Sequence, residues 1–211
     1  MNDTLFPRAP VVLSPGAFLF PGLALSRAAD IEKIVESVTG AAPFRRVVTP
    51  GGRPLSVAMT NMGARGWVSD RGGYRYEATD PLSGRPWPAI PDFLSAFARA
   101  AAARAGFPGF APDVCLINLY VPSAKMGPHV DRDEEDFSQP IVSVSLGLPA
   151  VFLWGGPNRS DRLRRVPIED GDVVVWGGPA RLFYHGVAPV RPGRHPRWGE
   201  RRINLTFRRA S

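Results

Sequence analysis

Residues 141–176 have the sequence IVSVSLGLPAVFLWGGPNRSDRLRRVPIEDGDVVVW, in which short apolar runs alternate with glycine- and proline-rich turns. Runs rich in β-branched and aromatic side chains favour strands, and glycine or proline pairs favour the turns between them. The predicted strands here are Ile141–Leu148, Val151–Trp154, Arg164–Ile168 and Val173–Trp176. Similar runs flank them at Val114–Tyr120, Leu182–Val187 and Ile203–Arg208. The pattern predicts a jelly-roll-like double-stranded β-helix core over about residues 113–211.

Two amphipathic helices are predicted ahead of these strands. The first segment ends at Gly40, and the second follows Pro91 and ends at Gly106. Apolar residues recur at the spacing of one helix face, at Ile31, Ile34, Val35 and Val38 in the first segment and at Leu94, Phe97, Ala98 and Ala101 in the second. Each helix should lay its apolar face against a sheet. With these flanking N-terminal helices, the predicted fold class is α+β, mainly β.

The segment between the helices, Thr49–Pro88, is rich in glycine and proline but carries large aromatic rings. These rings are Trp67, Tyr74, Tyr76 and Trp87. Aromatic residues on a flexible surface segment suggest a lid over a binding site. The alternative is that the rings anchor a long irregular segment to the core.

Size and charge narrow the class of protein. The 211 residues, 44% of them hydrophobic, fit a single catalytic domain spanning residues 1–211. The net charge of +7 is typical of proteins that meet nucleic acid, although solubility alone would also account for it. A lone cysteine, Cys115, excludes an internal disulfide and a multi-cysteine zinc site. Its apolar neighbours predict a buried, inert thiol in a reducing compartment.

Nothing in the sequence predicts export or membrane insertion. The apolar start that a signal peptide needs is interrupted by Asp3, Pro7, Pro10 and Pro15. No segment approaches the roughly 20 apolar residues of a membrane-spanning helix. We therefore expect a soluble, cytoplasmic monomer without membrane partners.

A candidate metal site begins with His129-Val130-Asp131 and is completed far downstream by His185. If His129 and Asp131 lie in extended backbone, alternation puts both side chains on one face. Two histidines and one carboxylate form the facial triad that holds non-haem Fe(II) and leaves coordination positions open. A hydrogen-bonded core pair is the alternative for an isolated His-x-Asp. The third histidine, His195, lies in a basic loop, so we expect it at the surface.

A candidate anion site follows from the last predicted strand, in which polar and apolar residues alternate. Its polar face consists of Arg202, Asn204, Thr206 and Arg208, and Asn118 and Tyr120 share one face of another strand. A polar face usually points to water, but two such faces could instead line a barrel interior. Arg202 and Arg208 lie about 20 Å apart along the strand, at ~3.3 Å per residue. Arginines reaching inward from both ends suit a small dicarboxylate, and we infer 2-oxoglutarate.

Several stretches of the sequence carry a family resemblance that extends well beyond the three candidate metal ligands. They are Pro43–Arg45, Val48–Gly52, Ser56–Asn61, Cys115–Asn118, Pro140–Ala150, Gly171–Gly178, Leu182–Gly186 and Asn204–Arg208. Together they resemble the AlkB family of Fe(II)- and 2-oxoglutarate-dependent nucleic-acid dealkylating dioxygenases. The resemblance covers most of the chain and implies a double-stranded β-helix core with a nucleotide-recognition lid formed by about residues 44–90.

The resemblance also implies roles for single residues at the metal and the cosubstrate. The residues that match iron ligands are His129, Asp131 and His185. The residues that match 2-oxoglutarate contacts are Asn118, Tyr120, Arg202, Asn204 and Arg208. Among these, Arg202 matches the arginine at the distal carboxylate and Arg208 the one beside the metal end.

Further matches concern the nucleic acid. Trp67 matches the aromatic residue that stacks on a flipped base opposite His129, and Asp133 the carboxylate beside the exocyclic amino group. Other substrate contacts implied by the resemblance are Glu134, in the same motif as Asp133, the lid tyrosine Tyr74, the lid-turn residue Thr49 and the basic Arg159. Arg53 departs from the family pattern, since an aromatic residue is expected there.

The implied activity is oxidative demethylation of bases such as N1-methyladenine and N3-methylcytosine, as direct reversal of alkylation damage. It would use Fe(II), O2 and 2-oxoglutarate and release formaldehyde, succinate and CO2. The expected partner is alkylated single-stranded or duplex DNA, with RNA left open as a second target. Two alternatives are an iron enzyme acting on a protein, lipid or metabolite, and a non-catalytic nucleic-acid binder with a structural His-Asp-His cluster.

Overall fold

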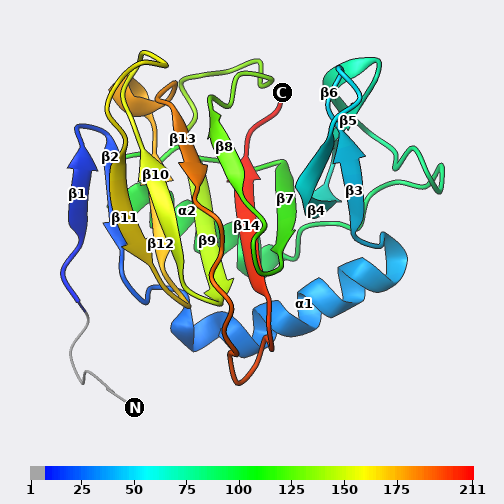
Figure 1. Cartoon of the computed structure of the whole chain (residues 1–211), viewed down its shortest axis with the longest axis horizontal. Helices are drawn as coiled ribbons and strands as arrows, with labels where there is room; N and C mark the ends of the chain where they lie inside the picture. Colours follow the sequence, from blue (N-terminus) through cyan, green and yellow to red (C-terminus); the bar gives the residue numbers. More distant parts are fainter. Residues whose placement is uncertain (1–7) are drawn as a thin grey trace.

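The computed structural model describes residues 8–211, so Asp3 and Pro7 of the predicted N-terminal interruption lie outside the described residues. The strands of the larger sheet, in sheet order, are β1 (Val11–Ser14), β2 (Ala17–Phe20), β12 (Val173–Trp176), β9 (Ile141–Gly147), β14 (Arg202–Arg208), β7 (Val114–Tyr120), β4 (Pro54–Gly63) and β3 (Arg45–Val48). A smaller sheet consists of β11 (Arg164–Ile168), β10 (Ala150–Trp154), β13 (His185–Val187) and β8 (Met126–His129). The strands β5 (Gly66–Asp70) and β6 (Gly73–Glu77) form a hairpin (Figure 1).

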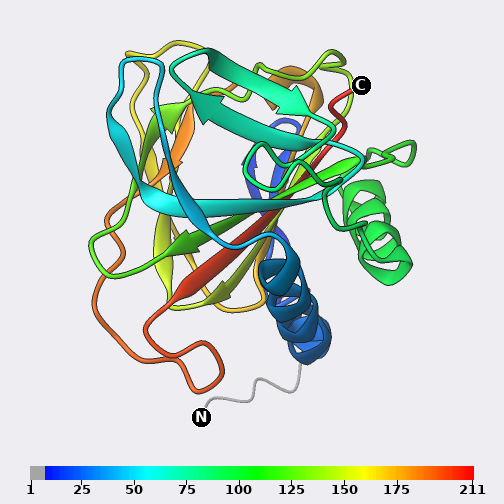
Figure 2. The ribbon, with the colours of Figure 1, turned by 90° about the vertical axis from the view of Figure 1, so that its right-hand side faces the viewer.

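Two helices, α1 (Ala28–Ala41) and α2 (Asp92–Arg104), cover one face of the larger sheet, and 3-10 turns lie at Leu25–Arg27 and Gly178–Ala180. Figure 2 shows both helices on one side of β14 and the smaller sheet on the other. One hydrophobic cluster joins Ile31 and Leu94 of the helices to Leu205 of β14. A second cluster, which includes Phe152 and Trp176, fills the space between the sheets. These layers confirm the predicted mainly β class with a jelly-roll core.

The alternating pattern of β14 decides which chemistry faces which layer. Leu205 and Phe207 turn toward the helices and are fully buried in the first cluster. The polar residues between them therefore point into the space between the two sheets, because successive strand side chains take opposite faces. Exposure to water, the ordinary outcome for a polar face, does not occur: Arg202, Asn204, Thr206 and Arg208 are all buried, as expected for residues that line the interior.

One predicted helix end and one predicted strand start differ from the structure. Helix α1 continues through Gly40 to Ala41, and the Ala42 N–H still donates to the Val38 carbonyl at 2.7 Å. A glycine in the last turn costs only about 1 kcal/mol, which packing against the sheet offsets. The strand predicted from Leu182 begins only at His185, because residues before it continue the turn that includes Gly178–Ala180.

Residues 44–90 are continuous with the core sheet, although they were predicted as a lid. The residues of β4 pair with β7, from Ala58 opposite Leu119 to Gly63 opposite Val114. The larger sheet therefore extends beyond residues 113–211, and it also includes β1 and β2. Within residues 44–90, the β5–β6 hairpin belongs to neither the larger nor the smaller sheet. A lid function for the segment stays a prediction.

The aromatic rings of this segment support both alternatives: some anchor the segment to the core, and others face a binding pocket. Trp87 is 4% exposed, and its indole N–H donates to the Glu77 carbonyl at 3.0 Å, so this ring anchors the segment. Tyr76 reaches the buried carboxylate of Glu134, while Trp67 and Tyr74 line a pocket described below.

Cys115 is fully buried, as predicted, and burial raises the pKa of its thiol. Neither α1 nor α2, nor another helix among residues 8–211, combines the length and the hydropathy required to cross a membrane.

Candidate active site

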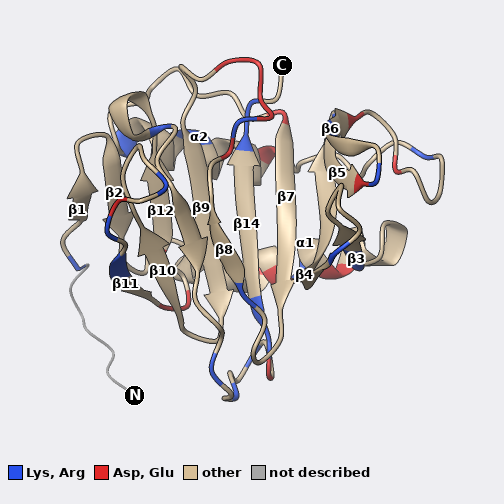
Figure 3. Cartoon of the chain, turned by 45° about the horizontal axis from the view of Figure 1, so that its top comes forward, with Lys and Arg blue, Asp and Glu red and all other residues tan. Residues whose placement is uncertain are grey.

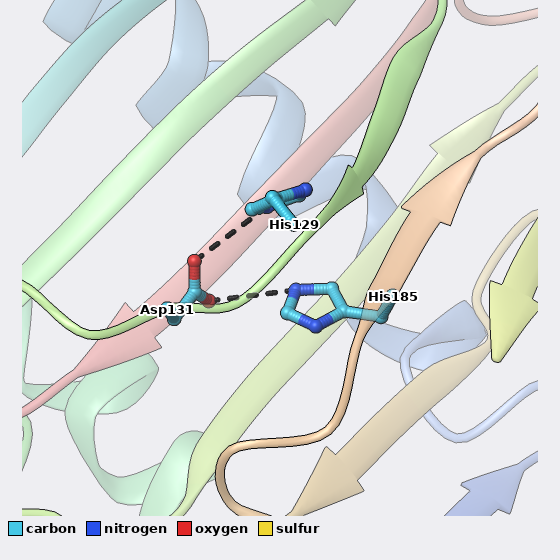
Figure 4. Close-up of side chains that lie close together, drawn as sticks. All are labelled: His129, Asp131 and His185. Atoms are coloured by element: carbon cyan, nitrogen blue, oxygen red, sulfur yellow. Dashed lines mark ion pairs between the residues drawn. The ribbon is translucent and has the colours of Figure 1, made fainter. Parts of the chain in front are cut away.

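Two strand ends bring the two candidate histidine ligands together. His129 ends β8, His185 begins β13, and the two residues are direct partners in the antiparallel pair. Asp131 lies two residues beyond the end of β8. Its Oδ1 lies 3.6 Å from His129 Nε2, and its Oδ2 lies 3.6 Å from His185 Nε2. Figure 4 shows the three side chains pointing toward one another.

The outward nitrogens of both imidazoles are fixed by the backbone. His129 Nδ1 lies 2.9 Å from the Gly127 carbonyl, and His185 Nδ1 lies 3.0 Å from the Phe183 carbonyl. A carbonyl can only accept, so each Nδ1 carries the proton and each Nε2 lone pair faces the cluster. Metal-binding histidines are commonly oriented in this way.

The electrostatics of the cluster suit a divalent cation. Desolvation of the imidazole, together with the neighbouring His185, lowers the pKa of His129 to about 4, so this imidazole is neutral at pH 7. Burial alone would raise the pKa of Asp131, but Arg208 and His185 hold it well below its usual value. One carboxylate and two imidazoles, with ligand atoms within 4.8 Å of one another, fit Fe(II).

A cavity of about 550 Å³ opens between the sheets and contains this cluster. Its wall is formed by the polar faces of β7 and β14, by the smaller sheet and by the β5–β6 hairpin. The predicted site residues that line it are His129, Asp131, His185, Asn118, Tyr120, Arg202, Asn204, Arg208, Trp67, Tyr74, Asp133 and Arg159. Most of the candidate residues thus surround one pocket.

Arg202 is a buried cation without an anionic partner. It is 2% exposed, and no carboxylate among residues 8–211 lies within salt-bridge distance of it. One terminal nitrogen donates to Ser145 Oγ at 3.0 Å, whereas Nε and Nη1 have no hydrogen-bond partner. The guanidinium lies over the Tyr120 ring at 4.7 Å, and burial lowers its pKa. A buried charge left in this state calls for an anion, and the two free N–H groups suit a carboxylate.

The opposite end of the same strand face meets the metal cluster. Arg208 Nη2 donates to Asp131 Oδ2 at 2.8 Å, and this carboxylate raises the pKa of Arg208 although burial opposes the charge. Arg208 Nε and Asn118 Oδ1 are buried without a hydrogen-bond partner. The free N–H groups of Arg202 at one end and the Arg208 cation at the other fit a dicarboxylate held at both ends.

An aromatic recess lies beside the cluster. The rings of Trp67 and Tyr74 are stacked, with centroids 5.5 Å apart and an interplanar angle of 17°. The Trp67 indole N–H donates to Asp133 Oδ2 at 2.8 Å. Asp133 therefore fixes the orientation of Trp67, a function that the sequence did not indicate, in addition to offering negative charge at the pocket.

Asp133 provides a prediction about charge in this recess. In Asp133→Asn the amide oxygen can still accept from Trp67, but the negative charge is lost. We expect KM for an oligonucleotide with a cationic methylated base to rise about fivefold, the effect of roughly 1 kcal/mol for a solvent-accessible charge. KM for 2-oxoglutarate should not change. Asp133→Ala should cost more, because Trp67 also loses its acceptor, and equal effects of the two variants would refute the orienting role.

Glu134 lies outside the pocket that contains most of the other candidate residues. Its side chain is 1% exposed, it does not line the pocket, and it accepts from Tyr76 at 2.6 Å and from Arg181 at 3.1 Å. Asp133 lines the pocket, whereas the adjacent Glu134 faces Tyr76 and Arg181, so a substrate contact by Glu134 stays a prediction. Glu134 is a buried anchor of the loop.

Two other predicted positions differ in their placement. Thr49 does not line the pocket; it closes the β3–β4 turn, where its Oγ1 accepts from the Arg53 N–H at 3.2 Å. His195 is half-buried rather than at the surface, because its Nδ1 accepts the backbone N–H groups of Arg197 and Trp198. Its Nε2 lies 3.5 Å from Asp170, away from the metal cluster.

Comparison with known proteins gives consistent matches. A family model described as the 2OG-Fe(II) oxygenase superfamily matches residues 16–208. The chain is 52% identical over 199 residues to the alpha-ketoglutarate-dependent dioxygenase AlkB of Salmonella typhimurium, covering 94% of this chain and 92% of that protein. It is 50% identical over 198 residues to the protein of the same name from Escherichia coli, with coverages of 94% and 92%. The solved structure of OsALKBH1 matches with a TM-score of 0.84 and 31% identity, covering 95% of this chain and 100% of that chain.

Proposed function

This chain belongs to the 2OG-Fe(II) oxygenase superfamily, and we propose that it oxidatively demethylates N-alkylated bases in DNA as a repair enzyme. It is an alpha-ketoglutarate-dependent dioxygenase of the AlkB type. The observation that carries the substrate proposal is the single pocket in which the His-Asp-His cluster, the unpaired Arg202 and the Trp67–Asp133 recess meet. RNA is a second candidate substrate.

When bound, Fe(II) would activate O2 and 2-oxoglutarate would supply two electrons by decarboxylation to succinate and CO2, which leaves one oxygen atom of O2 to hydroxylate the methyl carbon. The residues that would hold the metal are His129, Asp131 and His185. Arg202 would bind the distal carboxylate of 2-oxoglutarate, and Arg208 would neutralise charge at the end near the metal. Asp131, His185 and Arg202 are buried, so the inner part of the pocket is shielded from bulk water.

The recess favours a base that carries positive charge. A methylated cationic ring stacked on Trp67 gains cation-π energy of roughly 1 to 2 kcal/mol that a neutral base lacks. The Asp133 carboxylate adds attraction from the edge of the pocket. The nucleotide must leave its stack to reach the pocket, and this costs least in single strands or where methylation already prevents pairing.

Basic segments suit the nucleic-acid backbone. Figure 3 shows Lys and Arg residues around β11 and in the loop that leads into β14, and in the sequence these segments are rich in arginine. Arg159 lies at the pocket itself and is exposed. Phosphate contacts from such residues make binding salt-dependent without selecting a sequence.

The test is a panel of substrates with Fe(II), O2 and 2-oxoglutarate. An oligonucleotide containing N1-methyladenine or N3-methylcytosine should yield formaldehyde and succinate, and the unmethylated oligonucleotide should not. Succinate formed only with a protein or small metabolite would contradict the DNA substrate. Binding of the oligonucleotide with no succinate under any condition would favour a non-catalytic binder.

Trp67→Ala separates base binding from cosubstrate chemistry. We expect KM for the methylated oligonucleotide to rise about 5- to 30-fold, which corresponds to the loss of roughly 1 to 2 kcal/mol of stacking. Decay of 2-oxoglutarate without nucleic acid should be largely retained, since Arg202 and the metal cluster are unchanged. Equal loss of both reactions would indicate a structural role for Trp67.

A further inference from the structure

A buried arginine outside the pocket clamps the loop that carries Asp131. Arg181 is 2% exposed and does not line the cavity. Its Nη1 donates to the Asp131 carbonyl at 2.8 Å, and its Nε donates to the Gln139 carbonyl at 2.9 Å. Its Nη2 donates to Glu134 Oε2 at 3.1 Å. One guanidinium thus holds the start, the middle and the end of the loop.

The loop has little other support from regular structure. Residues 130–140 contain no strand or helix. Their main-chain bonds include Glu135 N–H to the Ala210 carbonyl at 3.2 Å and a long bond within the loop, Gln139 N–H to the Asp136 carbonyl at 3.4 Å. An unpaired main-chain carbonyl in this buried position would be costly, so the Arg181 donors stabilise one arrangement of the loop.

The position of Arg181 links the two halves of the metal cluster. It follows the 3-10 turn Gly178–Ala180, and its own N–H donates to the Gly178 carbonyl at 3.1 Å. The chain then reaches His185 only four residues later. Arg181 therefore ties the segment that precedes one ligand to the loop that carries another.

We propose that Arg181 is a positioning residue that sets the location of Asp131, and of the neighbouring Asp133, relative to His185. The inference rests on the proposed metal-binding role of Asp131. Arg208 holds the Asp131 carboxylate, but Arg181 holds its main chain, and the two contacts together leave the carboxylate one position. Loss of the clamp would let the loop shift without removing a ligand.

Metal affinity tests the proposal without any turnover. Binding of Mn(II) to the metal-free full chain would be followed by electron paramagnetic resonance, and the ligand set by the visible absorption of bound Co(II). We expect Arg181→Met to weaken Mn(II) binding about 10- to 100-fold, the range for residues that orient metal ligands. The Co(II) spectrum should change shape, because Asp131 no longer occupies a fixed position.

Arg45→Met is the matched control. Arg45 is also a mostly buried arginine that pairs with a carboxylate, Asp80, and lies over an aromatic ring, that of Trp87 at 5.0 Å. Arg181 has similar neighbours, since it pairs with the Glu134 carboxylate and lies over the Phe137 ring at 5.4 Å. The control should lose comparable thermal stability but keep the Mn(II) affinity and the Co(II) spectrum of the unmodified protein.

Arg181→Lys keeps the test decisive if Arg181→Met does not fold. Lysine preserves the charge opposite Glu134 but lacks the fork that reaches both carbonyls, so we expect an intermediate Mn(II) affinity. Unchanged affinity and spectrum in Arg181→Lys, or an equal loss in Arg45→Met, would overturn the proposal while leaving the proposed function intact. Failure of the unmodified protein to bind Mn(II) would overturn both.

Discussion

His185→Ala is expected to abolish demethylation of methylated oligonucleotides. Substitution of residues that only orient metal ligands commonly costs 10- to 100-fold, so loss of a ligand itself should lower kcat/KM by more than about 100-fold. His185 is 5% exposed, its Nε2 faces Asp131 at 3.6 Å, and it belongs to the one His-Asp-His cluster found among residues 8–211. The measurement is formaldehyde release together with Mn(II) affinity.

His195→Ala is the matched control for this prediction. Its imidazole also lies near an aspartate, at 3.5 Å from Asp170, but it does not line the pocket. We expect His195→Ala to retain Mn(II) affinity and turnover.

The His185→Ala variant should also have a lower melting temperature, because the His185 ring packs against the Trp176 ring with centroids 4.8 Å apart. Retained turnover in folded His185→Ala would remove this residue from the metal site.

Arg202→Met should have the second largest effect. Methionine fills a similar space but removes the buried cation that has no other anionic partner. The loss of one member of a buried charge pair costs at least about 2 kcal/mol, which is a rise of about 30-fold or more in KM for 2-oxoglutarate. The kcat at saturating 2-oxoglutarate should fall much less, because the metal ligands stay in place.

The neighbouring Arg201→Met is the control for Arg202→Met. The Arg201 side chain donates to the Trp198 carbonyl at 3.1 Å and does not line the pocket. Its substitution should leave KM for 2-oxoglutarate unchanged. An unchanged KM in Arg202→Met, or equal changes in both variants, would show that Arg202 does not bind the cosubstrate.

Periodicity predicted the elements that form the pocket, because strand alternation is a strict local rule. The alternation in β14 placed Arg202 and Arg208 on one face, and the structure brings that face next to the metal cluster. Extended backbone was expected at His129, but the range of β8 was not predicted, because its sequence, Met-Gly-Pro-His, has low strand propensity and the strand is held by pairing with β13. The strand β4 was missed because several of its residues are buried on both faces, which removes the alternating pattern.

Side-chain direction in loops limited the prediction of the site. Asp133 and Glu134 are adjacent acidic residues that the sequence alone cannot tell apart. In the folded chain Asp133 lines the pocket, whereas Glu134 faces Arg181. Arg181 itself lies in a turn without periodicity, so nothing local distinguished it from the many surface arginines. The hydrogen bond from Trp67 to Asp133 spans 66 residues and likewise depends on the folded chain.

The ratio of formaldehyde to succinate in one reaction tests the central claim most directly. The enzyme would be mixed with Fe(II), O2, 2-oxoglutarate and an excess of an N1-methyladenine oligonucleotide, and both products would be measured over time. If the pocket couples cosubstrate oxidation to the methyl group, one formaldehyde should appear for each succinate, with an equal amount of repaired adenine. Succinate that accumulates while the methylated base stays intact would contradict this account.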